Sequence, residues 1–318
     1  MKTISVLIPC RNEEKFIGNV LDNVIRQTFF SRVVDIYCLD GLSDDNTQKI
    51  IAEYSDKYQQ IHLELNPERI VPFALNKGIK KSKGEIIIRL DAHTEYANDY
   101  FEKIIETFET IETDIAGGPM RAIGKTNFQK AVAYATSTKM GVGDSSFHNE
   151  NAKGFVDSVY LGAWKRELFS AVGFFDERMK RNQDDEFHYR AKSMGKKIFL
   201  NPEIKSWYYP RNTLRKLFSQ YFQYGLYKPL VLKKVKSEVK LRHLIPLAFV
   251  FYLALMPLLI LVFGNYALVP LLIYLILILY FTFASKENFK TKIVIPGIYP
   301  VLHSSYGLGF FLGLFKKM

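Results

Sequence analysis

Short apolar runs alternate with longer mixed stretches through the first 120 residues of the chain. The mixed stretches repeat apolar residues every three or four positions, which is the period of an amphipathic helix. Strands alternating with helices are typical of parallel sheets covered on both faces, so we expect an α/β fold. The five expected strands are ISVLIPC (4–10), VVDIYCLD (33–40), IHLELN (61–66), EIIIRLD (85–91) and DIAGGPM (114–120).

Beyond residue 120 the alternation becomes less regular. The run KTNFQKAVAYATSTKMG predicts a helix, and the Gly-, Ser- and Asn-rich residues 141–154 predict a loop that orders over a substrate. RNQDDEFHYRAKSMG predicts a helix with an acidic first turn, where the helix dipole stabilises negative charge. KKIFLNPEIKSWYY predicts one or two further strands.

The last third of the chain is apolar in a different way. Residues 244–263 and 266–284 are uncharged, and each run is long enough to cross a hydrocarbon layer of about 30 Å. Gly264 and Asn265 separate them, so we expect a tight hairpin of two spans. A third uncharged segment, 293–315, contains two prolines and a histidine. We expect it to span too, with re-entry or an interfacial position as alternatives.

Residues 212–234 join these two parts and combine apolar residues at helical spacing with basic neighbours. Such a helix beside a membrane span is typical of an interfacial helix, although an ordinary domain-covering helix has the same pattern. The expected organisation is therefore a catalytic domain over 1–210, a basic interfacial helix and linker over 211–242, and a membrane region over 243–318.

The net charge of +11 is concentrated next to the apolar tail. Residues 201–242 contain ten Lys and Arg against two Glu, whereas residues 1–200 are close to neutral. A nucleic-acid-binding protein places its basic excess on the folded domain, so this distribution argues against nucleic acid and favours a membrane surface. Basic clusters before the first span and after the second predict a multi-pass cell-membrane protein with its large domain in the cytoplasm.

The two cysteines and the N-terminal residues are consistent with a large domain in the cytoplasm. Cys10 and Cys38 lie in apolar strand-like runs, which predicts two buried, reduced thiols rather than a disulfide or metal pair. The first ten residues form too short an apolar stretch for a signal peptide.

Candidate chemistry lies where the expected strands end. Asp91 and His93 follow the fourth strand, and alternation places residues two apart on the same side, so both can reach one ion. A carboxylate with an imidazole suits Mn²⁺ better than Ca²⁺, and such an ion would bridge substrate phosphates. Capping of the next helix is the plain alternative.

Two more turns end at the same expected edge of the sheet. Pro9 closes the first strand and is followed by Arg11, which is a candidate for phosphate, and by Asn12 and Glu13. Asp40 closes the second strand and is a candidate for the base or ribose of a nucleotide. The residues that follow it, 43–45, are expected to cap the next helix.

The acidic turn Asp184–Asp185–Glu186 offers a general base, since a base needs only hydrogen-bond reach to the group that it deprotonates. An acidic first turn of a helix is the structural alternative for any one of them. The residues alone leave the choice among the three open. Trp164, Arg211 and Gln220 are candidates for the acceptor or the diphosphate, with core or membrane packing as the alternative.

In this order the segments IPCRNEE, LDGLSDDNT, PFALNKGIKKSKGEIIIRLDAH and NQDDEFHYRAKSMG resemble the motifs of the family 2 inverting glycosyltransferases. The resemblance covers residues 3–230 and implies the nucleotide-sugar-binding GT-A fold. The wording Asp91-Ala92-His93 is similar to a branch of the family in succinoglycan and other exopolysaccharide assembly, which also carries a membrane tail.

The resemblance implies a hexosyltransferase that takes a sugar, most simply from a UDP-sugar, to a lipid-linked or glycan acceptor. The resemblance also implies a role in the synthesis of an exopolysaccharide, capsule or cell-surface polysaccharide, with other assembly enzymes as partners. Mn²⁺ or Mg²⁺ would be held by Asp91 and His93, and Asp184 would be the general base, with Asp185 as the second choice. The donor-binding residues would be Pro9, Arg11, Asn12, Glu13, Asp40, Asn76, Lys77, Arg89 and Asp91.

Two departures from the family pattern define the rival interpretations. His93 stands where a second Asp is usual, and Gln183 stands where a Glu is usual. These changes keep open a non-catalytic membrane partner built on a degenerate transferase fold. A sugar nucleotidyltransferase would share the carboxylates at the strand ends but would not need an acceptor base. The Gln-x-x-Arg-Trp motif of processive synthases does not occur in the sequence, which argues against a polymerising synthase.

Overall fold

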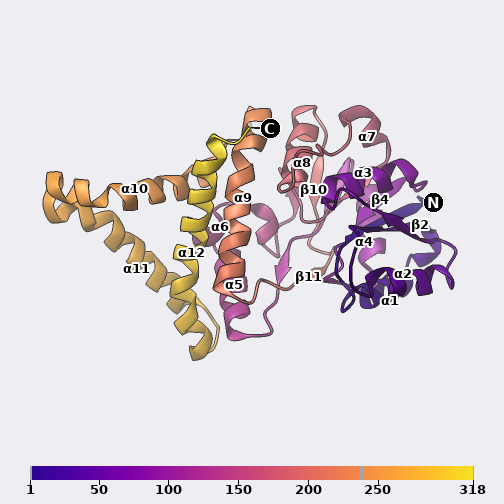
Figure 1. The fold of residues 1–318 in the computed structure, drawn as a ribbon, viewed down its shortest axis with the longest axis horizontal. Helices are drawn as coiled ribbons and strands as arrows, with labels where there is room; N and C mark the ends of the chain where they lie inside the picture. The colour runs from indigo at the N-terminus through magenta and orange to yellow at the C-terminus, as the bar shows by residue number, and fades with distance from the viewer. Residues whose placement is uncertain (1, 237–238, 318) are drawn as a thin grey trace. The chain divides into compact units, whose positions relative to one another are not determined.

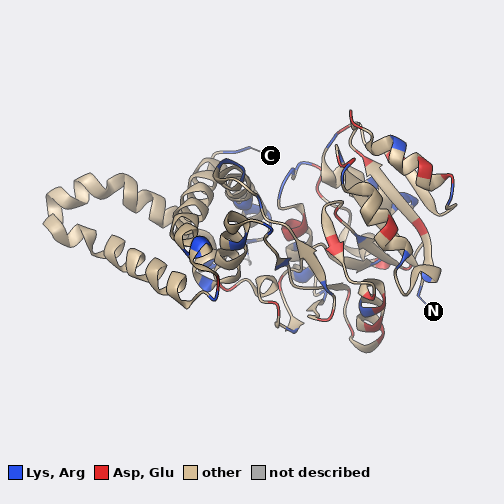
Figure 2. Cartoon of the chain, turned by 90° about the horizontal axis from the view of Figure 1, so that it is seen from below, with Lys and Arg blue, Asp and Glu red and all other residues tan. Residues whose placement is uncertain are grey.

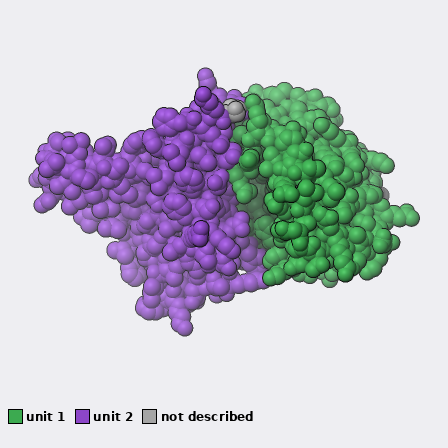
Figure 3. Space-filling model, in the orientation of Figure 1, with its two compact units in different colours: residues 1–121, 149–208 green, residues 122–148, 209–318 purple. Residues whose placement is uncertain are grey.

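The computed structural model describes residues 2–236 and 239–317 (Figure 1). Residues 237, 238 and 318, which belong to the expected linker and membrane region, lie outside the described residues. The chain forms two compact units, which Figure 3 colours separately. The first unit comprises residues 1–121 and 149–208, and the second comprises residues 122–148 and 209–318.

An eight-stranded sheet with the order β3-β2-β1-β4-β9-β6-β10-β8 forms the centre of the first unit. Strands β3, β2, β1 and β4 are parallel neighbours, and β6 is parallel to β10. The expected α/β class is therefore confirmed. The strands are β1 (Ile4–Cys10), β2 (Val33–Asp40), β3 (Ile61–Leu65), β4 (Ile86–Arg89), β6 (Ile115–Gly117), β8 (Gly154–Phe155), β9 (Ala163–Lys165) and β10 (Ile198–Leu200).

Two strands of this sheet, β8 and β9, were not anticipated. β9 runs antiparallel between β4 and β6, so the fourth and fifth expected strands are not neighbours. β1 and β2 have the expected bounds, whereas β3, β4 and β6 end earlier than their apolar runs. The ladder between β1 and β2 also continues past Pro9 to the pair Cys10–Asp40, so the expectation that Pro9 ends it was wrong.

Helices cover both faces of this sheet because the side chains of β1 alternate between them. Ile4, Val6 and Ile8 share a core with α1, α2 and α4. Leu7 faces α3, where an added Cβ at Gly78 would lie 2.6 Å from its side chain. Burying one such aliphatic side chain contributes roughly 1.5–3 kcal/mol. The helices of this unit are α1 (Ile17–Ile25), η1 (Phe30–Arg32), α2 (Thr47–Ser55), α3 (Val71–Lys81), α4 (Tyr100–Thr110), α7 (Glu167–Val172) and α8 (Gln183–Ser193).

The carboxyl ends of β1, β2 and β4 meet at one edge of the sheet. The register pairs Cys10 with Asp40 and Leu7 with Arg89, so the turns after these strands begin at neighbouring points. Sheets of this type bind ligands at that edge. A smaller sheet, in the order β5-β11-β7, continues directly from the turn after β4. Its strands are β5 (Thr94–Tyr96), β7 (Arg121–Ala122) and β11 (Ser206–Tyr208).

The second unit is helical. Its elements are α5 (Asn127–Ser137), α6 (Lys139–Val142), η2 (Ser146–His148), α9 (Leu214–Lys234), α10 (Leu241–Phe263), η4 (Gly264–Leu268), α11 (Val269–Ala284) and α12 (Phe289–Leu314). The expected helix after residue 124 is broken at Thr138, whose hydroxyl caps α6 by accepting from the Gly141 amide. The expected loop 141–154 is divided between the two units.

Helix α5 packs with the C-terminal helices rather than with the sheet. Its Ala131, Val132 and Ala135 share one buried cluster with Ile298 and Tyr299 of α12. The expected scheme assigned α5 to the domain 1–210, and the structure differs because the apolar face of α5 finds its partners in α12. The boundaries at residues 210 and 242 stay predictions.

Within the described residues, one helical segment, Leu241–Ala284, is long and apolar enough to cross a membrane. In it α10 leads away from α12, η4 turns the chain and α11 returns (Figure 1). Figure 2 shows this hairpin without charged residues along most of its length, and residues 243–284 contain no Lys, Arg, Asp or Glu. The third expected span forms α12, and its crossing of a membrane stays a prediction.

Helices α9 and α12 approach each other through glycines. An added Cβ at Gly225 would lie 2.1 Å from the carbonyl oxygen of Tyr306, and one at Gly309 would lie 2.1 Å from that of Phe222. Small residues that let backbones touch are characteristic of helix packing in membranes. The expected helix over 212–234 is therefore present as α9, and its interfacial position stays a prediction.

Candidate active site

The turns after β1 and β2 are joined by hydrogen bonds. The Asn12 amide donates to the Ser43 hydroxyl at 2.8 Å, and the Asp44 amide donates to Asn12 Oδ1 at 3.1 Å. The Glu13 amide donates to the Thr47 hydroxyl at 2.8 Å. Asn12 has a φ of 56°, a left-handed conformation that asparagine tolerates better than most residues. Asn12 and Glu13 therefore lie near Asp40, as the sequence predicted.

Asp40 is fully buried and organises its own turn. Its carboxylate accepts from the Ser43 amide at 2.9 Å, from Gln48 Nε2 at 2.7 Å and from the Ser43 hydroxyl. A buried carboxylate with several donors is the stable arrangement, because an unpartnered one carries a large desolvation cost. The contact of Asp40 with a nucleoside stays a prediction.

Capping of α2 differs from the expectation. Only Asp45 acts on the first turn of that helix, accepting from the Thr47 amide at 2.9 Å and from the Thr47 hydroxyl at 2.5 Å. Ser43 and Asp44 instead bond to the neighbouring turn through Asn12. Their role as caps was wrong because the adjacent strand supplies partners that a single segment of sequence does not reveal.

Three of the expected donor-binding residues have other partners. Asn76 is buried and exchanges hydrogen bonds with the Phe175 backbone at 2.9 and 3.0 Å. Lys77 donates to the Leu65 carbonyl at 2.7 Å and pairs with Glu64 at 3.0 Å. These contacts hold α3 against its neighbours. Arg11 is exposed, and its side chain packs along Gly41.

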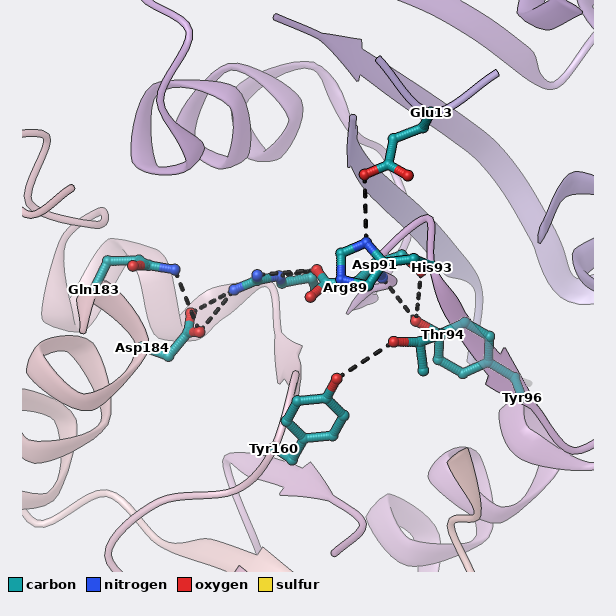
Figure 4. A network of polar contacts seen from close by, with 9 residues as sticks. All are labelled: Glu13, Arg89, Asp91, His93, Thr94, Tyr96, Tyr160, Gln183 and Asp184. Atoms are coloured by element: carbon teal, nitrogen blue, oxygen red, sulfur yellow. Dashed lines mark hydrogen bonds and ion pairs between the residues drawn. The ribbon is translucent and has the colours of Figure 1, made fainter. Parts of the chain in front are cut away.

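The turn after β4 carries Asp91 and His93. Tyr96 holds its backbone, because the Asp91 amide donates to the Tyr96 hydroxyl at 2.7 Å. The Thr94 amide closes the turn on the Asp91 carbonyl at 3.2 Å. The His93 ring faces Glu13, with 3.3 Å between Nδ1 and Oε1 (Figure 4). The structure thus brings the turn after β1 and the turn after β4 together.

Arg89, the last residue of β4, bridges two carboxylates from distant parts of the chain. Its Nε and Nη2 donate to Asp91 Oδ1 at 3.0 and 2.9 Å. Its Nη1 donates to both oxygens of Asp184, at 2.8 and 2.7 Å. Figure 4 shows the guanidinium lying between the two carboxylates. The expected diphosphate ligand and the expected base are therefore joined by one side chain.

Burial shapes the electrostatics of this triad. The side chain of Arg89 is 8% exposed, and that of Asp184 is 28% exposed. Removal from water raises the pKa of the Asp184 carboxyl above its usual range, and Asp91 and Asp185 add to this, while Arg89 opposes it. The two carboxylates raise the pKa of Arg89. A carboxyl with a raised pKa is a better proton acceptor than a solvated aspartate, which suits a general base.

Asp185 belongs to a second polar chain beside the first. Ser158 donates to Asp185 Oδ1 at 3.4 Å and lies 2.8 Å from His188 Nδ1. His188 is buried, and desolvation lowers its pKa to about 4, so it is neutral at physiological pH. Ser158 and His188 were missed because nothing in the segment VDSVYLG or in α8 alone marks them as neighbours.

The three acceptor candidates are divided between the two units. Trp164 is fully buried in β9 and packs on Phe175 and Phe187, so it is a core residue and offers no face to an acceptor. Arg211 and Gln220 belong to the second unit. Gln220 donates to the Tyr224 hydroxyl at 3.0 Å along α9.

The carboxylate of Asp91 fits a divalent cation that takes most of its other ligands from substrate phosphates and water. Within residues 2–236 and 239–317, no cluster of three or more His, Cys, Asp or Glu could hold a metal ion. Mg²⁺ is commonly bound by one or two carboxylates together with substrate phosphates. Arg89 occupies Asp91 Oδ1, and no side chain in the described part of the chain bonds to Asp91 Oδ2.

A search of family models gives a match to Glycosyl transferase family 2 over residues 5–173, which is more than half of the chain. The chain belongs to this family. It is a glycosyltransferase, as the motifs predicted. The match includes β1, β2, β4 and the turns that carry Asp40 and Asp91, while α8 with Asp184 lies beyond it.

Two curated proteins are similar to this glycosyltransferase over most of its length. Succinoglycan biosynthesis protein ExoA of Rhizobium meliloti (strain 1021) is 31% identical over 246 residues, covering 76% of this chain and 74% of that protein. The second, from Methanococcus voltae, is 30% identical over 328 residues, covering 99% of this chain and 98% of its own. It is named dolichyl N-acetyl-alpha-D-glucosaminyl phosphate 3-beta-D-2,3-diacetamido-2,3-dideoxy-beta-D-glucuronosyltransferase.

A solved structure confirms the GT-A-like fold. The mannosyltransferase PcManGT from Pyrobaculum calidifontis, in complex with GDP-Man and Mn²⁺, superposes with a TM-score of 0.65 at 16% identity. The alignment covers 95% of this chain and 88% of that one. This glycosyltransferase is thus related to enzymes of exopolysaccharide and glycan biosynthesis.

Proposed function

We propose that this protein is a membrane-anchored inverting glycosyltransferase of exopolysaccharide, capsule or cell-surface polysaccharide biosynthesis. It transfers a sugar from a nucleotide-diphosphate sugar, a UDP-sugar in the simplest case, to a lipid-linked or glycan acceptor. The observation that carries the proposal is the pair of carboxylates, Asp91 and Asp184, joined by Arg89 at the carboxyl edge of a parallel sheet.

The donor lies across the strand ends in this proposal. The turns containing Pro9, Asn12, Glu13 and Asp40 flank the nucleoside, and Arg11 faces the phosphates. Asp91, with His93 at its side, would hold Mn²⁺ or Mg²⁺ on the diphosphate. The bound cation offsets the negative charge of the leaving nucleoside diphosphate. The Mn²⁺ and GDP-Man in the PcManGT complex support a donor of this class.

Asp184 acts as the general base. It accepts the proton of an acceptor hydroxyl, whose oxygen attacks the anomeric carbon from the side opposite the departing diphosphate, so the configuration inverts. The pKa of its carboxyl, raised by burial, makes it a stronger base than a solvated aspartate. Asp185 is the second candidate, and its carboxylate accepts from the Ser158 hydroxyl at 3.4 Å.

The acceptor is held at a membrane. The apolar segment Leu241–Ala284 would cross as two spans, with α12 as a third, and the catalytic unit would lie in the cytoplasm. Basic α9, which contains Gln220 and follows Arg211, would lie along the headgroups. The relative named for a dolichyl-linked sugar phosphate supports a lipid-linked acceptor. Other assembly enzymes would supply that acceptor or consume the product.

The decisive experiment measures binding of UDP, GDP, CDP and dTDP to the full-length protein in detergent, with and without Mn²⁺. Asp91→Asn is tested beside the wild type, and thermal unfolding shows that both are folded. We expect one nucleotide to bind selectively and to depend on Mn²⁺, and we expect Asp91→Asn to lose that dependence. Folded wild-type protein that binds none of the four would overturn the proposed donor site.

A further inference from the structure

The guanidinium of Arg89 is shared between two carboxylates that have different tasks in the proposed reaction. Its Nε and Nη2 are committed to Asp91 Oδ1, and its Nη1 is committed to Asp184. Arg89 comes from β4 and Asp184 from the first turn of α8, which is 95 residues further along the chain. The single positive charge of Arg89 therefore pairs with two carboxylates, and the Arg89 side chain is 8% exposed.

We propose that Arg89 is a positioning residue that couples occupancy of the cation and diphosphate site at Asp91 to the ion pair that holds the base Asp184. This inference rests on the proposed function, because it assigns the donor site to Asp91 and the base to Asp184. It adds a link between the two sites.

The physical reason for this coupling is competition for charge. A divalent cation at Asp91 repels the guanidinium and draws on the carboxylate that the guanidinium now shares. Arg89 then loses part of its attraction to Asp91 and pairs more fully with Asp184. Because the Arg89 side chain is only 8% exposed, solvent screens this exchange weakly. Donor loading would thus tighten the hold on the base before an acceptor arrives.

Coupling between two sites is reciprocal, so the base must also influence the cation. Replacing Asp184 by Asn leaves the whole guanidinium charge to Asp91. The cation then competes with a stronger ion pair, and its affinity falls. This effect requires no acceptor and no chemical step, which separates it from the role of Asp184 as a base.

The test measures the Mn²⁺ concentration that gives half-maximal nucleoside diphosphate binding in the absence of acceptor. The probes are UDP, GDP, CDP and dTDP with full-length wild-type protein, Asp184→Asn and the matched control Asp185→Asn. The control removes the same charge from the adjacent residue, whose carboxylate accepts from the Ser158 hydroxyl. We expect Asp184→Asn to raise the half-maximal Mn²⁺ concentration about five-fold or more, and Asp185→Asn to leave it within about two-fold.

Arg89→Lys completes the cycle. A lysine keeps the charge but has no fork with which to hold two carboxylates at once. In the Arg89→Lys background we expect Asp184→Asn to change the half-maximal Mn²⁺ concentration by less than half as much as in the wild type. Thermal unfolding of each variant identifies any loss of fold, and the comparison of Asp184→Asn with Asp185→Asn does not depend on the Lys variant folding.

The outcomes distinguish the two proposals. Equal changes in the half-maximal Mn²⁺ concentration for Asp184→Asn and Asp185→Asn would mean that the effect depends only on net charge. That result would overturn the coupling and leave the proposed donor site intact. An equal effect of Asp184→Asn on the half-maximal Mn²⁺ concentration in the wild-type and Arg89→Lys backgrounds would also overturn the coupling. Folded wild-type protein that binds no nucleoside diphosphate would remove the donor site itself, and the coupling with it.

Discussion

The turn after β2 and the turn after β4 both present a carboxylate at the same edge of the sheet, but they satisfy it in opposite ways. Asp40 is fully buried and receives neutral donors from its own loop and from α2. Asp91 remains partly exposed and shares a guanidinium with Asp184. Neutral donors from its own loop and α2 satisfy the charge of Asp40, whereas the shared guanidinium leaves Asp91 and Asp184 sensitive to any further charge.

The difference separates a carboxylate held by neutral donors from two carboxylates that share one charged partner. A residue type at the end of a strand does not reveal which of these applies. The identity of the donors reveals it. Neutral amides fix a carboxylate in one place, whereas a guanidinium shared by two carboxylates can shift its hydrogen bonds from one to the other. Four changes break or sharpen this comparison.

The largest effect is expected for Asp184→Asn. An amide cannot accept the acceptor proton, so sugar transfer should fall about 10²- to 10⁴-fold while the protein stays folded. Release of nucleoside diphosphate from donor in membranes that contain acceptor measures the rate. Wild-type rates in folded Asp184→Asn would move the base to Asp185 or remove it from this turn.

Asp40→Ala should act on stability instead. It leaves the Ser43 amide and Gln48 without their buried acceptor, so we expect the free energy of unfolding to fall by about 1–3 kcal/mol. Denaturant unfolding in detergent measures the change. Asp44→Ala is the control, since Asp44 is exposed and its substitution should stay within about 0.5 kcal/mol. Equal losses for the two variants would contradict the structural role of Asp40.

Ser43→Ala tests the junction between the turns after β1 and β2. It removes one acceptor for the Asn12 amide and one donor to Asp40. We expect a loss of about 1 kcal/mol in the free energy of unfolding, smaller than for Asp40→Ala. The same unfolding assay checks the order of the two variants, and a larger loss for Ser43→Ala would reverse the assignment of Asp40 as the centre of the turn.

The smallest effect concerns pH. Asp184 must be ionised to act, and burial raises its pKa, so the rate should fall on acidification at a pH above the usual aspartate range. Asp185 contributes to that rise, and Asp185→Asn should therefore move the acid limb to lower pH by less than about one unit. The pH profile of the turnover number reports both. A limb that moves to higher pH in Asp185→Asn would contradict the sign of this interaction.

The sequence predicts those parts of this protein in which local pattern and tertiary structure agree. β1 and β2 end where their apolar runs end, and α8 begins on its acidic turn. β9 was not predictable, because nothing in the three residues Ala163–Lys165 indicates that they pair between β4 and β6. The bridging role of Arg89 was hidden for the same reason, since its second partner is 95 residues away.

The site residues divide along the same line. His93 and Glu13 lie 3.3 Å apart, because parallel strands place their carboxyl ends together, and the shared ion at Asp91 and His93 stays a prediction. Asn76 and Lys77 match the motif but bond to backbone and side chains around α3. A motif records which residue types recur at a spacing, and it does not separate those that support a loop from those that contact a ligand.

The packing of α5 sets a condition on synthesis. Its buried face, Ala131, Val132 and Ala135, has partners in α12 that leave the ribosome roughly 160 residues later. At about 5–20 residues per second this interval is on the order of 10 s. During that time the apolar face of α5 lacks its partners in α12, so this buried cluster is completed only after the last helix is made.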